Sequence, residues 1–302
     1  MDHGKLGFLE DKLDGVYLSR EKSRYVLSLI PYEETTTYKT GARGGPSAIV
    51  EASPHMELLD ETLHVNASIH GILTLAPEIT DLASIASHSA AVARAHPGSL
   101  LGFLGGEHSI TPAILAGLGR TDIGIVWIDA HADLRKEFRG RPDNHACAGF
   151  NSVGFGPIVQ IGVRSLSEEE VDYLGRSDRV KCFRPWCEAA RDAIRALPKS
   201  VYVSIDMDGF SPMLIRAVGT PEPGGLMWEE AMEILDFVFG EKDVFGYDVV
   251  ELCPHPDLDD RSETEAVVRR ASVVVGLAAV LLAKVGVGVD PDDPDILTAE
   301  AL

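Results

Sequence analysis

Runs of apolar, largely β-branched residues recur along this chain, and stretches with helical patterning separate them. Runs that are continuous in Val, Ile and Leu are typical of strands buried on both faces, because a strand with one wet face alternates apolar and polar residues. Alternation of such strands with helices favours βαβ crossovers and a parallel sheet. We therefore predict an α/β fold with strands at Tyr25–Ile30, Leu100–Leu104, Ile123–Ile128, Ile158–Ile161, Val201–Ile205 and Val244–Val250.

Helical patterns lie between and after these strands, and no internal repeat or Ser/Gly-rich linker divides the chain. The predicted helices are Asp81–Ala95, Thr111–Leu118, Glu168–Leu174, Glu188–Leu197, Trp228–Phe239 and Thr264–Leu282. A chain of 302 residues suits one large α/β domain or two small ones, and the unbroken alternation favours one. We predict a single domain over 1–302, with a core at about 24–284 and an acidic C-terminal tail at 285–302.

The charge and cysteine content narrow the range of partners. A formal net charge of −20 repels nucleic acid and steers cationic ligands toward the protein, although an acidic surface also serves solubility alone. The four cysteines form no C-x-x-C pair, which indicates reduced thiols in the cytosol. The most apolar stretch, Ala271–Ala283, is shorter than a membrane span, and the N-terminus lacks the apolar run of a secretory signal. We expect a cytoplasmic protein that binds neither nucleic acid nor membranes.

Three segments that contain acidic residues and histidines follow predicted strands, where ligands of parallel sheets bind. They are Leu104–Ser109, with His108; Trp127–Asp133, with Asp129, His131 and Asp133; and Val203–Asp208, with Asp206 and Asp208. Alternate side chains of an extended segment point to one side. Asp129, His131 and Asp133 are therefore expected to converge, as are Asp206 and Asp208.

This set of four Asp and two His is a candidate metal site. Grouping carboxylates away from water costs several kcal/mol per unpaired charge, and no Lys or Arg lies within the three motifs. A single strand-end Asp is more often a helix cap, so the combination carries the argument. Sites rich in carboxylates and free of thiolates suit Mn²⁺ better than structural zinc. Four carboxylates suffice for two ions roughly 3.5–4 Å apart, an arrangement that activates water, so we predict two Mn²⁺ per chain.

With these motifs the sequence resembles the ureohydrolase family of arginase, agmatinase and their relatives, and it is closest to agmatinase. The resemblance extends from Thr35 to about Leu282. The segments that carry it are Thr37–Pro46, Gly105–His108, Asp129–Asp133, Ser204–Asp208, Gly219–Gly225 and Asp248–Glu251. It implies a three-layer α/β/α fold around a central eight-stranded parallel sheet. It also implies a homo-oligomer, either a trimer or a hexamer, and a small cationic guanidino substrate.

The resemblance also implies roles for individual residues. One Mn²⁺ would be bound by His108, Asp129, Asp133 and Asp206, and the other by Asp129, His131, Asp206 and Asp208, so that Asp129 and Asp206 bridge. The family's chemistry is attack of an activated water on the guanidinium carbon, with Asp133 orienting the water and passing its proton on. His145 would be a proton shuttle, for which a titration point near neutral pH is suited. Glu251 would pair with the substrate guanidinium.

Departures from the family pattern bear on the substrate. Arginases carry an Asn shortly after D-A-H-x-D that reads the α-carboxylate of arginine, whereas here Asp133 is followed by Leu-Arg-Lys-Glu-Phe. An unpaired buried carboxylate is costly, so arginine should bind poorly, whereas agmatine has the same guanidinium and no carboxylate. We therefore predict an agmatinase that releases urea and putrescine from agmatine. Arg135 is expected to form a structural ion pair, or alternatively to accept a substrate carboxylate. Ser211 stands where the family usually has Asp, and we expect it to alter loop support.

Several alternatives stay open at this point. Within the class, the substrate could be aminopropylagmatine, guanidinobutyrate, arginine or formiminoglutamate. A catalytically silent binding relative would show the loss of a ligand or of the shuttle histidine, but all six ligands and His145 are present. Metal-dependent deacetylases have a similar fold, but a ligand set for two ions argues against their single-zinc chemistry.

Overall fold

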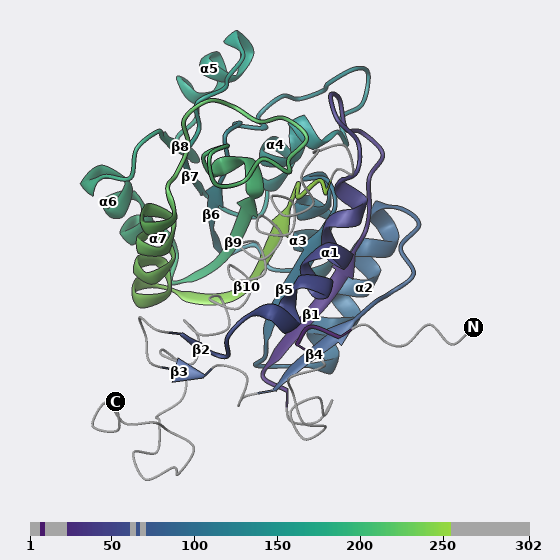
Figure 1. Cartoon of the computed structure of the whole chain (residues 1–302). Helices are drawn as coiled ribbons and strands as arrows, with labels where there is room; N and C mark the ends of the chain where they lie inside the picture. The colour runs from purple at the N-terminus through teal and green to yellow at the C-terminus, as the bar shows by residue number, and fades with distance from the viewer. Residues whose placement is uncertain (1–6, 10–22, 61–64, 67–70, 255–302) are drawn as a thin grey trace.

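The centre of the protein is an eight-stranded sheet in which every pair of neighbouring strands is parallel (Figure 1). The structure is a computed structural model that describes residues 7–9, 23–60, 65–66 and 71–254. In spatial order the strands are β4 (Ile72–Leu75), β1 (Tyr25–Ile30), β5 (Leu100–Gly105), β10 (Asp243–Val250), β9 (Ser200–Asp206), β6 (Gly124–Ile128), β7 (Ile158–Ile161) and β8 (Val180–Phe183). The predicted α/β class and its parallel sheet are confirmed.

Six of the eight strands begin and end within a residue of the predicted ranges, and the two that were missed, β4 and β8, form the edges of the sheet. The central strands β5, β6 and β7 are buried at every residue, which gives the continuous apolar signal. The edge strand β8 is buried only at Val180 and carries the exposed Lys181. An edge strand needs no apolar face toward a further neighbour, so its composition is closer to that of a loop.

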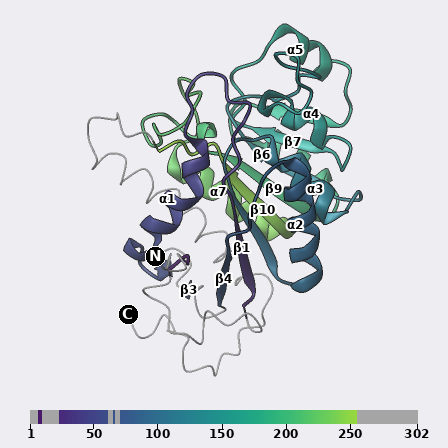
Figure 2. The same cartoon turned by 90° about the vertical axis from the view of Figure 1, so that its right-hand side faces the viewer.

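Helices cover both faces of the sheet and complete three layers (Figures 1 and 2). One core cluster includes side chains of α1 (Gly45–Ala52), α6 (Glu188–Ala196) and α7 (Trp228–Glu241). The other includes or contacts side chains of α2 (Leu82–Ala95), α3 (Ile110–Leu118), α4 (Ala148–Ser152) and α5 (Glu168–Leu174). Shorter elements are η1 (Ala42–Gly44), η2 (Ser53–His55), η4 (His145–Cys147), η5 (Met207–Gly209) and the antiparallel pair of β2 (Leu59–Asp60) with β3 (Val65–Asn66).

Helix α2 illustrates how local sequence sets a boundary. Asp81 precedes the helix and accepts a hydrogen bond from the backbone N–H of Ser84 at 2.7 Å, and the Ser84 hydroxyl lies 3.1 Å from the Asp81 backbone nitrogen. This reciprocal capping satisfies N–H groups that a helix start leaves without partners. The predicted helix Thr264–Leu282 and the tail at 285–302 lie outside the described residues, so the predicted domain limits stay predictions. Among the described helices, none combines the length and apolar character needed to cross a membrane.

The carboxyl ends of the four central strands meet at one edge of the sheet. Ile128 of β6 pairs with Ile205 of β9, and Val250 of β10 pairs with Asp206, the last residue of β9. Leu104 of β5 pairs with Val249. The loops that leave these four strands therefore begin at the same level, and each carries at least one residue of the site described next.

Candidate metal centre and substrate pocket

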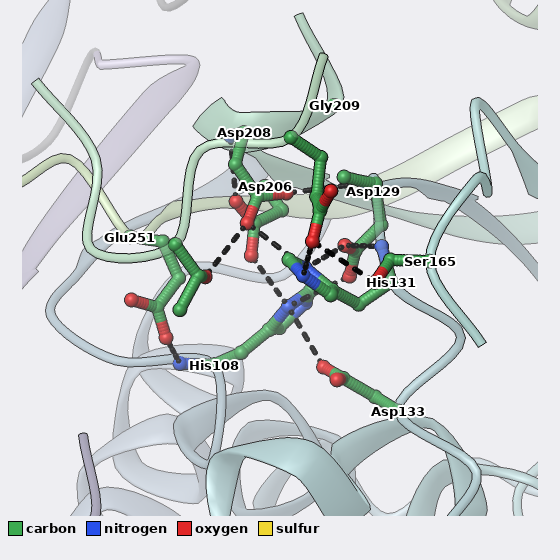
Figure 3. Close-up of polar contacts among 12 residues, drawn as sticks. His108, Asp129, His131, Asp133, Ser165, Asp206, Asp208, Gly209 and Glu251 are labelled. Carbon is green, nitrogen blue, oxygen red and sulfur yellow. Dashed lines mark hydrogen bonds and ion pairs between the residues drawn. The ribbon is translucent and has the colours of Figure 1, made fainter. Parts of the chain in front are cut away.

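The six predicted ligands and Glu251 come together beyond the carboxyl ends of β5, β6, β9 and β10 (Figure 3). His108 follows β5, the D-A-H-A-D run follows β6, Asp206 ends β9 and Glu251 follows β10. Alternation along an extended strand, the geometry expected from the sequence, is not what makes the side chains converge. The strand β6 ends before Asp129, and the motif continues as a turn in which Asp133 has a positive φ of 53°.

Hydrogen bonds within the motifs fix these turns. The carboxylate of Asp129 accepts the backbone N–H of His131 at 2.6 Å, and that of Asp206 accepts the backbone N–H of Asp208 at 2.7 Å. Asp208 accepts the N–H of Ala130 at 3.1 Å, so the two motifs are tied to each other. An Asp that bonds the backbone two residues ahead favours a turn, which explains why a D-x-H or D-x-D spacing suits this place.

The first ligand cluster is fully buried around His108. Its Nδ1 atom lies 3.1 Å from Asp206, 3.2 Å from Asp129 and 3.4 Å from Asp133, measured to one carboxylate oxygen of each. The indole of Trp127 stacks on the His108 ring, with centroids 4.2 Å apart, and donates a hydrogen bond to Asp129 at 2.8 Å. Trp127, two residues before Asp129, therefore orients a predicted ligand directly.

The second cluster lies closer to the pocket and is centred on His131. The Nδ1 atom of His131 lies 3.0 Å from Asp208 and 3.6 Å from Asp129. Asp129 thus faces both clusters, as a bridging ligand would. The His131 side chain is 25% exposed, whereas that of His108 is 1% exposed, so the second cluster is the more accessible one.

The donor atoms of both clusters fit divalent cations. His108, Asp129 and Asp206 each offer one donor atom, all within 4.8 Å of one another, and Asp129, His131 and Asp208 do the same. Asp133 falls outside these compact groups, at the edge of the first. Imidazole nitrogens and carboxylate oxygens suit Mn²⁺ and similar ions, and no thiolate joins either group. Each group holds three of the four ligands predicted for one ion, since Asp133 is absent from the first group and Asp206 from the second. The roles of single residues in binding metal stay predictions.

The pKa values of an acid and of a histidine in the clusters are both raised, which reflects crowded negative charge. Burial, followed by the charges of Asp208 and Asp129, raises the pKa of Asp206 well above its usual value. Burial alone would lower the pKa of His131, but hydrogen bonds to Asp129 and Asp208 outweigh it and raise that pKa to about 12. A buried site that retains protons in this way is short of positive charge, and divalent cations would supply it.

The tautomer of His108 is set from outside the cluster. Its Nε2 atom lies 2.9 Å from the hydroxyl of Ser204, which donates its single hydrogen to Asp248 at 2.6 Å. Nε2 must therefore be the donor to Ser204, so Nδ1, which faces the carboxylates, is the atom that a bound metal ion would contact. Thr111 and Tyr202 also donate to Asp248, at 2.8 and 2.9 Å. Such outer hydrogen bonds orient metal ligands.

Sequence reasoning did not assign this outer set of Ser204 and Asp248, although both residues lie in motifs that carry the family resemblance. Ser204 precedes Asp206 by two residues in β9. Asp248 lies in β10, three residues before Glu251, which follows that strand. A buried polar side chain on an otherwise apolar strand was the available signal, since such groups need partners. Which partners they have depends on the pairing of β9 with β10, which a motif does not reveal.

Glu251 lies beside the clusters, and one of its oxygens is already engaged. The Oε1 atom accepts the backbone N–H of His108 at 2.8 Å, and the Glu251 backbone N–H donates to the Gly106 carbonyl at 2.8 Å. Burial, partly offset by the His108 N–H and the His108 charge, raises the pKa of Glu251 to about 8. Glu251 also has a positive φ of 62°, a strained conformation for a non-glycine residue that is found most often at functional sites.

His145 lies next to Glu251 on the pocket wall. Its Nδ1 atom is 3.8 Å from Glu251, and its Nε2 atom is 3.4 Å from the hydroxyl of Thr37. The His145 backbone N–H donates to Thr35, whose hydroxyl donates to the buried Glu107. Burial lowers the pKa of His145, so the ring is neutral at neutral pH and able to accept a proton.

These groups open into a cavity of about 210 Å³, and residues after β6 and around α5 form much of its wall. Lining side chains include Asp133, His145 and Glu251, together with Arg135 and Phe138. The expected structural ion pair of Arg135 is not found among the described residues, where its guanidinium lies over the Phe138 ring at 4.8 Å from the centroid. Arg135 is therefore part of the pocket wall.

Ser211 takes part in a loop, as expected from its place after the D-x-D motif. Its hydroxyl accepts the backbone N–H of Met213 at 3.3 Å, and its backbone carbonyl accepts those of Leu214 and Ile215. The side chain is 5% exposed and is not among those that line the cavity. Its role in the structure is support of the turn.

Comparisons with known proteins agree with this geometry. The model of the arginase family matches residues 23–276. The N(1)-aminopropylagmatine ureohydrolase of Synechocystis is 36% identical over 251 residues, which are 74% of this chain and 80% of that protein. The agmatinase of Pyrococcus horikoshii is 36% identical over 237 residues, 76% of this chain and 83% of that protein. The agmatine ureohydrolase structure of Thermoplasma volcanium superposes with a TM-score of 0.77 at 26% identity, covering 93% of this chain and 97% of that one. The chain therefore belongs to the arginase family and is a hydrolase of amidino C–N bonds.

Proposed function

We propose that the protein uses two Mn²⁺ ions to hydrolyse the terminal guanidino group of a linear polyamine, releasing urea and the corresponding amine. The observation that carries this proposal is the position of Glu251. An acid that can receive a guanidinium shares one small cavity with Asp133, His145 and both ligand clusters. A guanidinium has donors in a fixed fork that a carboxylate accepts well.

The residues divide the chemistry among them. Two bound divalent ions would supply the positive charge that lowers the pKa of water and makes it a nucleophile near neutral pH. Glu251 would hold the guanidinium, with Oε1 fixed by the His108 N–H and Oε2 free for the ligand. Asp133 lines the cavity and would orient the attacking water and carry its proton toward the leaving nitrogen. His145, neutral and beside Glu251, would exchange that proton with solvent.

The leading substrate is a guanidino compound without a carboxylate at its far end. Relatives of both kinds, one named for aminopropylagmatine and one for agmatine, are 36% identical to this chain. We place aminopropylagmatine first, because the ureohydrolases of Thermococcus kodakarensis and Thermus thermophilus, each 34% identical to this chain, are also named for it. Agmatine, the substrate predicted from sequence alone, is second. Arg135 favours a third candidate, guanidinobutyrate, since a cation without an ionic partner among the described residues could receive its carboxylate.

Urea release after loading with Mn²⁺ distinguishes these substrates. We expect kcat/KM to be highest for aminopropylagmatine, followed by agmatine and then by guanidinobutyrate, whose carboxylate Arg135 could pair. Arginine should be at least about tenfold lower than agmatine, because its α-carboxylate would be poorly paired on burial. The variant Arg135→Gln tests whether this residue of the pocket wall influences the choice of substrate. It is expected to leave the polyamine substrates unchanged or to improve them, because it removes a like charge. A preference for guanidinobutyrate that Arg135→Gln abolishes would overturn the proposed substrate class.

Removal of metal is expected to lower the stability of the fold. The apo site packs three carboxylates around two histidines, with a fourth, that of Asp133, 3.4 Å from His108. Ions that bind only the folded state stabilise it by about 2.7 kcal/mol at a free concentration one hundred times Kd. Differential scanning fluorimetry of the apo protein should therefore show a rise in Tm of several degrees with Mn²⁺. Mg²⁺ at the same concentration is the control. An equal response to both ions would contradict a site built for Mn²⁺.

A further inference from the structure

The loop Gly219–Gly225 contributes two side chains that contact the second ligand cluster. Thr220 donates to Asp208 at 3.2 Å, and Glu222 lies 3.7 Å from the Nε2 atom of His131. Gly219–Gly225 is one of the segments that carry the family resemblance, and of these two residues only Thr220 lies on the cavity wall. Glu222 has no place in the chemistry proposed above, yet its carboxylate is directed at a predicted ligand.

The loop is held so that Glu222 keeps this position. The guanidinium of Arg164 donates to the backbone carbonyls of Glu222, Pro223 and Asp208, at 3.0, 3.1 and 2.7 Å. Gly225 has a φ of 103°, and a Cβ atom there would lie 2.7 Å from the backbone of Phe210. Arg164 thus links the loop to the D-x-D turn, and the glycine permits the loop to approach it closely. The position of Glu222 is therefore built into the backbone.

The carboxylate itself is oriented by Ser165. The Ser165 hydroxyl donates to Glu222 Oε1 at 3.0 Å, which is the same oxygen that faces His131 Nε2. Ser165 and His131 also form an isolated β-bridge, and Figure 3 shows their side chains next to each other. Glu222, Ser165 and His131 are thus connected by one hydrogen bond, one bridge and one ionic contact.

From this geometry we propose that Glu222 is a positioning residue for the second metal ion. Its charge favours a proton on Nε2 of His131, so that Nδ1, which faces Asp129 and Asp208, is the atom left to bind the ion. This inference rests on the proposed function, because it takes His131 as a ligand. Ser204 holds Nε2 of His108 in the buried cluster. Glu222 is its counterpart in the more exposed cluster, where its carboxylate faces the Nε2 atom of His131.

The contact between Glu222 and His131 has the length of an electrostatic attraction rather than of a hydrogen bond that supports the loop. At 3.7 Å the two atoms are too far apart for an ordinary hydrogen bond, so the attraction is mainly electrostatic. Glu222 is about one-third exposed and so can adjust when a cation binds at Nδ1 and the imidazole becomes a stronger donor. Outer carboxylates of this kind typically change metal affinity by about 10- to 100-fold.

The test is a Mn²⁺ titration of the full-length protein by calorimetry, with EPR of the coupled Mn²⁺ pair as a second readout. In Glu222→Gln we expect the Kd of one ion to rise about 10- to 100-fold while that of the other stays unchanged. The coupled EPR signal should then require excess Mn²⁺. Ser165→Ala should shift the same Kd in the same direction but less, and Glu222→Asp should recover part of the loss. Glu229→Gln is the matched control, since it removes one charge from an exposed site on α7 and should change neither Kd.

Two results would overturn the proposal. Unchanged affinity for both ions, with a raised KM for the polyamine, would make Glu222 a substrate contact. Equal weakening of both ions together with a lower apo Tm would make it a support of the loop alone. His131→Ala separates these results from a failure of the proposed function. If that variant still binds two Mn²⁺, the ligand assignment is wrong whatever Glu222→Gln does. If it binds one, the Glu222 result stands by itself.

Discussion

Replacing Asp129 with Asn is expected to abolish most of the urea release and to lower the Mn²⁺ content below two ions per chain. Asp129 belongs to both ligand clusters, so a single substitution weakens both. We expect kcat to fall by about 10³-fold or more, equivalent to about 4 kcal/mol of transition-state stabilisation. Asn keeps the size of the side chain and one acceptor oxygen, so the fold should remain intact.

Metal content and thermal stability together identify the cause of the loss. Wild-type protein should gain Tm on Mn²⁺ addition, whereas Asp129→Asn should gain little, because its sites bind the ions poorly. Asp172→Asn is the matched control, since Asp172 is exposed on α5 and its side chain contacts neither cluster. It should keep two Mn²⁺ and full activity. An Asp129→Asn variant that retains both ions and normal kcat would refute the bridging role.

The sequence predicted the central part of the fold better than its edges. Strands such as β7, at Ile158–Ile161, are buried on both faces and therefore continuous in apolar residues, which is a strong local signal. The edge strand β4, at Ile72–Leu75, is only half-buried and is four residues long. Helix α1 begins with Gly45 and Pro46, which are typical of a turn, although Pro is well tolerated at a helix start.

The candidate site could be predicted in part for a similar reason. His108, Asp129 and Asp206 belong to short motifs that end strands, and the parallel sheet brings strand ends together whatever the exact geometry. The outer partners depend on contacts between distant segments, such as Glu222 with His131, 91 residues earlier in the chain. The unpaired state of Arg135 among the described residues was also not predictable, because an exposed Arg near acidic residues usually forms weak, interchangeable ion pairs.

Replacing Glu251 with Gln is expected to remove substrate recognition while leaving the metal centre intact. Gln has the same shape and can still accept the His108 N–H, but it cannot offer a charge to the guanidinium. A buried guanidinium that lacks its anion loses a charge-assisted pair, so kcat/KM should fall by about 10²- to 10³-fold. The Mn²⁺ content should stay at two per chain, which distinguishes this variant from Asp129→Asn. A loss of metal in Glu251→Gln would instead place Glu251 among the ligands.

The pH dependence of ligand binding gives a second, independent sign of this role. Because burial raises the pKa of Glu251 to about 8, the carboxylate of the metal-free protein is protonated below that pH and ionised above it. A guanidinium needs the ionised form, so binding of agmatine to the metal-free protein should strengthen as pH rises through about 8 and weaken as it falls. Calorimetry between pH 6 and about 9.5 would measure this dependence, in a range where the guanidinium keeps its charge. In Glu251→Gln the dependence should disappear, because a carboxamide has no proton to lose in this range. A slope that persists in the variant would assign the titrating group to another residue of the pocket.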